Sequence, residues 1–129
     1  MRPDGLWHPR LMAILTATGH GDLVVVADAG LPVPAGVEAV DLLWRRDQPD
    51  LVPVLAAVLT ECVVEHATIA EELTDVALRT GVEAALGAIP VDTVSHEELK
   101  RMSHAARVVV RTGASTPYAN VVLRCGVAF

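Results

Sequence analysis

The feature that most constrains the fold is a run of five apolar residues, Leu23 to Ala27, with three consecutive valines at its centre. Gly and Asp residues precede this run, and Asp28 and Gly30 follow it. A short, continuous apolar run between such residues is typical of a strand that is buried on both faces. Burial on both faces is characteristic of parallel sheets covered by helices. The run therefore predicts a central strand of an α/β sheet.

Polar side chains lie at both ends of this predicted strand. Asp28 follows it directly, at the edge where parallel sheets bind ligands. His20 precedes it between Gly19 and Gly21, and an imidazole acts readily as an acid or base near neutral pH. An Asp in such a position also serves as a turn or helix cap, and a lone loop His is commonly only exposed to solvent. A functional and a structural interpretation of the stretch both remain open at this point.

The rest of the chain alternates between helical and strand patterns, and its 129 residues suit one domain over residues 1–129. Several expected strands are continuously apolar, which predicts a three-layer α/β domain with a mainly parallel sheet covered by helices on both faces. Helices are expected over residues 9–18, 51–60, 74–90 (one or two) and 95–106; further strands are expected over 37–43, 63–70, 91–94, 107–111 and 121–123.

Composition excludes several classes of function. The apolar fraction of 52% is high for so short a chain, so we expect apolar surface to be buried between subunits of a homo-oligomer. A net charge of -6 with ten Lys and Arg argues against nucleic acid binding. No apolar run is long enough for a signal sequence or a membrane span, so we expect no membrane association and a cytoplasmic location. Cys62 and Cys125 lie in apolar stretches and are expected to be buried free thiols.

Metal, nucleophilic and phosphate sites are not indicated either. Of five histidines, His96 and His104 are two helical turns apart, and no HxxxH or CxxC pair is present. No serine occupies a GxSxG elbow. The glycines of GHGD lead into a strand instead of the helix that would bind a phosphate. We therefore expect the protein to need no metal or cofactor.

Acid–base chemistry on a neutral small molecule remains. His20 and His96 could move protons, while Asp28, Tyr118 and Asn120 could hold hydroxyl groups by directional hydrogen bonds. Each residue alone also has a structural explanation. His96 fits the first turn of a helix that begins after Ser95, Tyr118 fits a core aromatic, and Asn120 fits a turn.

Three segments give a more specific indication: GHGDLVVVADAGLPVP (Gly19 to Pro34), SHEELK (Ser95 to Lys100) and VVRTGASTPYANVVLRCGVAF (Val109 to Phe129). Together they resemble the D-ribose pyranase branch of the ribose pyranase and fucose mutarotase family, and the similarity covers nearly the whole chain. Gly21 is more similar to the fucose branch, whereas the DAGLP and YAN segments are similar to the ribose branch.

The resemblance implies a cytoplasmic, cofactor-free isomerase that interconverts the pyranose and furanose forms of ribose, assembled as a homodecamer with active sites between subunits. It implies that His20 is the catalytic acid and that Asp28 and His96 contact the sugar. Tyr118, Ala119 and Asn120 would complete the pocket. A mutarotase of fucose or another sugar, and a non-catalytic sugar-binding or regulatory ring protein, are the alternatives.

The length of the central strand adds one geometric expectation. A strand of five residues spans about 17 Å, so His20 and Asp28 of one chain are not expected to contact the same small sugar. A pocket assembled from two subunits, each contributing one end of the strand, satisfies this distance.

Overall fold

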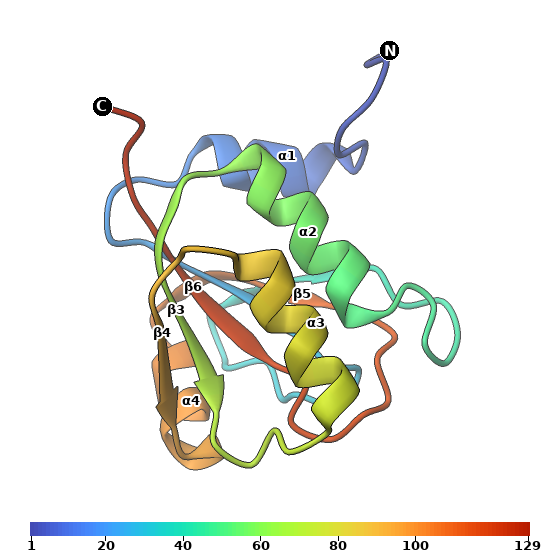
Figure 1. Cartoon of the computed structure of the whole chain (residues 1–129). Coiled ribbons are helices and arrows are strands. Elements are labelled where there is room, and N and C mark those ends of the chain that lie inside the picture. The colour runs from blue at the N-terminus through green and yellow to red at the C-terminus, as the bar shows by residue number, and fades with distance from the viewer.

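The computed structural model describes residues 1–129 and contains one sheet of six strands in the order β2-β5-β1-β6-β3-β4 (Figure 1). β6 is antiparallel to β1 and β3, and every other neighbouring pair is parallel, so five strands point in one direction. This confirms the predicted mainly parallel sheet. The elements are α1 (Pro9–Thr16), β1 (Leu23–Ala27), β2 (Glu38–Asp41), α2 (Leu51–Glu61), β3 (Val64–Ala70), α3 (Val76–Leu86), β4 (Val91–Val94), α4 (His96–Ser103), β5 (Ala106–Arg111) and β6 (Val121–Cys125).

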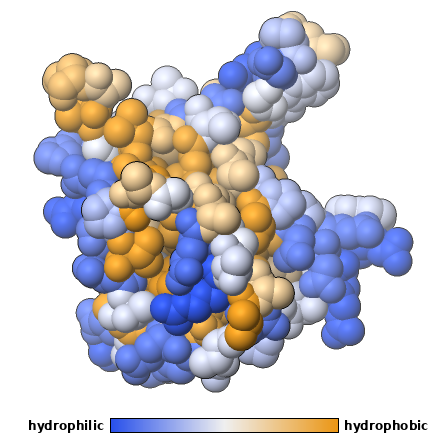
Figure 2. All heavy atoms as spheres, in the orientation of Figure 1, coloured by the Kyte–Doolittle hydropathy of each residue, from blue (hydrophilic) through white to orange (hydrophobic).

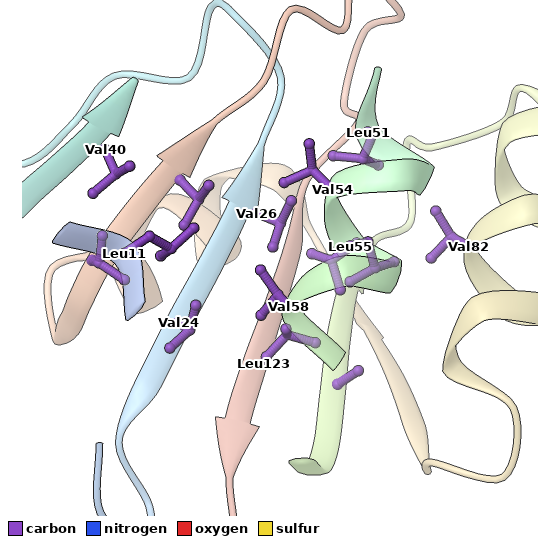
Figure 3. Close-up of a cluster of buried hydrophobic side chains, with 14 of the residues drawn as sticks. Leu11, Val24, Val26, Val40, Leu51, Val54, Leu55, Val58, Val82 and Leu123 are labelled. Atoms are coloured by element: carbon purple, nitrogen blue, oxygen red, sulfur yellow. The ribbon is translucent and has the colours of Figure 1, made fainter. Parts of the chain in front are cut away.

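β1 separates two hydrophobic clusters, because its alternate side chains point to opposite faces of the sheet. Val24 and Val26 pack with side chains of α1, α2 and α3 on one face (Figure 3). Val25 and Ala27 pack with Leu99 of α4 on the other. All five of these side chains are fully buried. In Figure 1, α2 and α3 lie in front of the sheet and α4 lies behind it, which confirms the three-layer arrangement.

The start of α4 follows from a capping residue that the sequence predicts. The Ser95 hydroxyl oxygen accepts a hydrogen bond from the backbone N–H of Glu98 at 3.1 Å, as an N-cap does. The Glu98 carboxylate does not complete a reciprocal capping box, because it accepts from Arg101 at 2.7 Å instead. The helix ends at Ser103, three residues before the predicted end.

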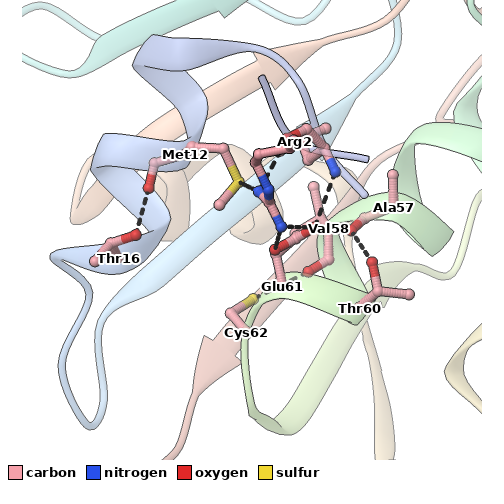
Figure 4. Close-up of polar contacts among 9 residues, drawn as sticks. Arg2, Met12, Thr16, Ala57, Val58, Thr60, Glu61 and Cys62 are labelled. Carbon is pink, nitrogen blue, oxygen red and sulfur yellow. Dashed lines mark hydrogen bonds and ion pairs between the residues drawn. The ribbon is translucent and has the colours of Figure 1, made fainter. Parts of the chain in front are cut away.

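The N-terminal segment is held against the end of α2 (Figure 4). The Glu61 carboxylate accepts the backbone N–H of Leu6 at 2.9 Å and lies 3.3 Å from the Arg2 guanidinium. The Leu6 hydrogen bond, followed by Arg2, lowers the pKa of Glu61. Cys62 and Cys125 are both free, as predicted, but Cys62 is only half-buried whereas Cys125 is buried.

The surface combines apolar and hydrophilic regions. Figure 2 shows hydrophobic residues exposed over much of the face that carries α2 and α3, while the loop before α2 is hydrophilic and projects from the side. Exposed apolar side chains include Val63, Val76 and Val91. None of the helices has the length and hydropathy required to cross a bilayer.

Gly113 fixes the loop that leads from β5 toward Tyr118. A Cβ at this position would lie 2.6 Å from the carbonyl oxygen of Arg45 and 2.7 Å from the backbone nitrogen of Gln48. We expect Gly113→Ala to lower the free energy of unfolding by about 1–3 kcal/mol, because backbone atoms of the neighbouring loop would have to move. Urea denaturation checks this. Gly30→Ala is the control, because its added Cβ would have no contact shorter than 3.6 Å, and equal losses in both variants would contradict the explanation.

Candidate active site

A carboxylate and an amide are paired where β1 ends and β6 begins. Because these strands are antiparallel and Val26 pairs with Val121, Asp28 and Asn120 face each other across the sheet edge. The Asp28 backbone N–H donates to Asn120 Oδ1 at 2.9 Å, and Asn120 Nδ2 donates to Asp28 Oδ2 at 2.9 Å. Asp28 Oδ1 accepts the Gly30 N–H at 2.9 Å. Two hydrogen bonds therefore fix the orientation of the Asp28 carboxylate, and a third joins the Asp28 backbone to Asn120.

His96 and Tyr118 form an aromatic pair at the same edge. Their rings meet edge to face, with centroids 5.0 Å apart and an interplanar angle of 75°. Tyr118 adopts the left-handed backbone conformation, with φ +64°, and its carbonyl accepts the Asn120 N–H at 2.9 Å. Ala119 between them is fully buried. The turn thus connects the aromatic pair to the Asp28–Asn120 pair.

The His96 ring has an unused polar atom. Its Nδ1 is buried and has no hydrogen-bond partner in the protein, and a buried nitrogen in this state is costly unless a ligand or water satisfies it. Tyr118 also borders a depression of about 350 Å³, whose other lining residues are Glu72, Thr74, Asp75, Thr116 and Pro117. The edge thus combines directional polar groups, an aromatic surface and open space, which suit a polyhydroxylated molecule.

Sequence reasoning missed Glu72, which holds the start of α4. Both of its carboxylate oxygens accept the backbone N–H of His96, at 3.0 and 2.8 Å. Glu72 follows β3 at the same carboxyl edge as Asp28. That position after a buried strand was the available signal, because ligands of parallel sheets bind at the carboxyl edge of the strands.

His20 lies at the opposite end of β1, on a turn held by Asp22. The Asp22 carboxylate accepts the Gly19 N–H at 2.8 Å and lies 3.0 Å from Arg107 Nε. The Gly19 hydrogen bond, and next the Arg107 guanidinium, lower the pKa of Asp22. Gly21 provides the positive φ, +84°, that the turn requires. The His20 side chain is 63% exposed, and its Nε2 is 3.0 Å from Glu65 Oε2.

The structure therefore brings together five of the six predicted site residues and leaves one apart. Asp28, His96, Tyr118, Ala119 and Asn120 share the carboxyl edge of the sheet, whereas His20 is at the amino end of β1. The largest pocket, about 470 Å³, is also near that amino end and contains none of the six residues. The carboxyl edge is the stronger candidate, because it holds five of the predicted residues and its Asp28 carboxylate is held in place by hydrogen bonds.

The residues at the carboxyl edge are not arranged as the ligands of a metal ion. No three His, Cys, Asp or Glu side chains in the structure are placed to hold one ion. The polar groups at the carboxyl edge are instead arranged as hydrogen-bond donors and acceptors, with an aromatic ring beside them.

Comparison with known proteins agrees with this fold. A family model described as the RbsD / FucU transport protein family matches residues 1–128. The chain belongs to this family. The D-ribose pyranase of Symbiobacterium thermophilum is 45% identical over 131 residues, and the D-ribose pyranase of Variovorax paradoxus is 47% identical over 133 residues, with 100% of both chains covered in each case.

Solved structures of RbsD/FucU proteins have the same fold. The structure of Bacillus subtilis RbsD complexed with D-ribose has a TM-score of 0.95 at 37% identity, with 100% of both chains covered. The fucose mutarotase from Streptococcus pneumoniae in complex with L-fucose has a TM-score of 0.81 at 20% identity, covering 95% of this chain and 94% of that chain. At this lower identity the similarity concerns the fold alone. The family expected from the sequence motifs is confirmed.

Proposed function

We propose that this RbsD/FucU protein is a D-ribose pyranase, a cofactor-independent isomerase that interconverts the pyranose and furanose forms of D-ribose, and anomers through the same open chain. The full-length similarity to a protein solved with D-ribose carries the proposal. The names of the full-length relatives point to the same reaction. The hydrogen-bonding edge around Asp28 and His96 supplies the groups that such a substrate needs.

Ring opening and ring closure each require two proton transfers. The anomeric hydroxyl loses a proton to water and the ring oxygen gains one, which opens the pyranose. Closure through a different hydroxyl, which loses its proton while the carbonyl oxygen gains one, gives the furanose. In our proposal His20 protonates the ring oxygen, while Asp28 and His96 orient the sugar hydroxyls. Tyr118, Ala119 and Asn120 complete the pocket. A positioned acid–base group contributes about 10²- to 10⁴-fold, which suffices for a reaction that already proceeds in water.

His20 reaches the sugar, in our proposal, from a second subunit. The five residues of β1 separate His20 from Asp28 by about 17 Å along the strand. A homo-oligomer in which one subunit contributes His20 and its neighbour contributes Asp28 brings both to one sugar, and the exposed apolar surface supports such an assembly. We propose the decamer implied by the family resemblance, acting in the cytoplasm.

Exchange NMR tests the reaction directly. With the protein present, we expect magnetisation transfer between the pyranose and furanose signals of D-ribose to accelerate in proportion to protein concentration. L-fucose in the same experiment identifies the preferred sugar: faster exchange of fucose would make the protein a fucose mutarotase. Binding of ribose without faster exchange would instead indicate a non-catalytic sugar-binding protein. Sedimentation velocity of the same sample reports the oligomeric state.

A further inference from the structure

Glu65 projects toward His20 from an irregularity in β3. The pairing of β3 with β6 is regular except between Val64 and His66, where the register shifts at Glu65. Such β-bulges change the direction of a side chain and occur often beside active sites. The Glu65 carboxylate reaches His20 on the neighbouring turn, with Oε2 3.0 Å from Nε2. The bulge thus places this acidic side chain against the predicted catalytic acid.

Neighbouring residues leave room for Glu65 and hold it. A Cβ on Gly126 would lie 3.3 Å from the Glu65 Cβ and 3.5 Å from its Oε2, so glycine at this position keeps the space open. Arg124 Nε lies 3.4 Å from Glu65 Oε1, whereas His20 contacts the other carboxylate oxygen, Oε2. Both Arg124 and Glu65 are partly exposed, so this ion pair contributes little energy. Its effect is to favour one orientation of the carboxylate.

We propose that Glu65 is a positioning residue for His20, an inference that rests on the proposed function. A carboxylate accepts only from a protonated nitrogen, so Glu65 keeps the proton of neutral His20 on Nε2 and leaves Nδ1 unprotonated. No hydrogen bond in the structure involves Nδ1. Nδ1 therefore accepts a proton from the solvent and donates it to the ring oxygen of the sugar. Between these two steps, the Glu65 carboxylate stabilises the imidazolium form of His20.

Other charges near the turn do not replace Glu65. Asp22 is on the same turn, but its carboxylate is engaged by Gly19 and Arg107. Arg124 is the positively charged residue of β6, and it contacts the Glu65 carboxylate. Glu65 is therefore the only carboxylate that contacts the His20 ring.

The test combines ring NMR with kinetics on the full-length protein. ¹⁵N NMR of labelled, sugar-free protein reports the tautomer of His20. We expect the fraction of the Nε2-protonated form to be higher in the wild type than in Glu65→Ala. Glu83→Gln is the matched control, since Glu83 pairs with Arg79 on the exposed side of α3. An unchanged His20 tautomer in folded Glu65→Ala would overturn the inference, whether or not ribose is converted.

Ribose exchange gives the second readout. We expect Glu65→Ala to lower kcat by about 10- to 100-fold with little change in KM, as for residues that orient a reacting group. In a His20→Ala background, Glu65→Ala should have no further effect on kcat. An equal loss in both backgrounds would show a general structural role and overturn the inference.

The proposed function can fail separately from this inference. If neither the wild type nor any variant accelerates ribose exchange, the proposed function is wrong, but the tautomer measurement still decides whether Glu65 positions the His20 ring.

Discussion

His20→Ala is expected to slow pyranose–furanose exchange of D-ribose by about 10²- to 10⁴-fold, the usual contribution of a positioned acid–base group. Because the side chain is 63% exposed, its loss should change the free energy of unfolding by only about 0.5 kcal/mol or less. Exchange NMR at equal protein concentration and urea denaturation separate the two effects. His104→Ala is the control, since His104 is an exposed residue at the end of α4. A His20→Ala protein with wild-type exchange rates would remove His20 from the mechanism.

The same variant tests whether one site uses two chains. His20→Ala and Asp28→Ala subunits should each be nearly inactive, but they affect opposite ends of β1. If each site takes His20 from one chain and Asp28 from its neighbour, random co-assembly leaves about a quarter of sites intact. Co-expression of the two variants should then restore exchange to that level. Mixed oligomers without any recovery would show that both residues act within one chain.

The strands and helices were predictable where burial or capping determines them locally. β1 begins and ends where the sequence predicts, because both of its faces are buried and glycine and aspartate flank it. His96 is in the first turn of α4 as expected, because Ser95 provides a recognisable cap. The direction of β6 was not predictable, since a short apolar run has the same pattern in a parallel and an antiparallel strand. Its two antiparallel pairings depend on the whole topology.

The site shows the same division between local and long-range information. Motif similarity predicts that Asp28 and Asn120 bind the sugar, but it does not predict their mutual hydrogen bonds, which join positions 92 residues apart. Glu65 and Glu72 were missed because their partners, His20 and His96, are 45 and 24 residues away. The only local signal for Glu72 was its position after β3, and no local pattern distinguishes Glu65 from a solvated surface residue. Only the sheet places their carboxylates against the two histidines.

Asn120→Asp is expected to destabilise the fold by about 2–4 kcal/mol at pH 7 and to weaken ribose binding. Asn120 is fully buried, and its Nδ2 donates to Asp28 Oδ2 at 2.9 Å. The substitution replaces this donor with a second carboxylate. Two carboxylates at such a distance repel each other when both are ionised, which raises the pKa of the pair. Urea denaturation at several pH values measures the loss, and exchange NMR with varied ribose measures the change in KM.

The pH dependence distinguishes charge repulsion from a simple packing defect. Because the pKa of the carboxyl pair is raised in the folded state, the variant is expected to be closest to wild type below about pH 4, where the protonated carboxyl group introduced at position 120 can donate as the amide does. The deficit should grow as the pH rises through the folded pKa. Asn120→Ala, which has no titrating group, should show a deficit with little dependence on pH.

Exchanging the two residues provides the matched rescue. In the double variant Asp28→Asn with Asn120→Asp, an amide at position 28 faces a carboxylate at position 120, so donor and acceptor are again paired. Two residues in direct contact couple strongly, and we expect the double variant to recover at least half of the stability lost by Asn120→Asp. Losses that simply add would show that the Asp28–Asn120 hydrogen bond does not determine stability at this edge. The double variant could also recover its stability without recovering ribose conversion. In that case the fold would be restored and only the position of the negative charge would differ, so the sugar must require the carboxylate at position 28 itself.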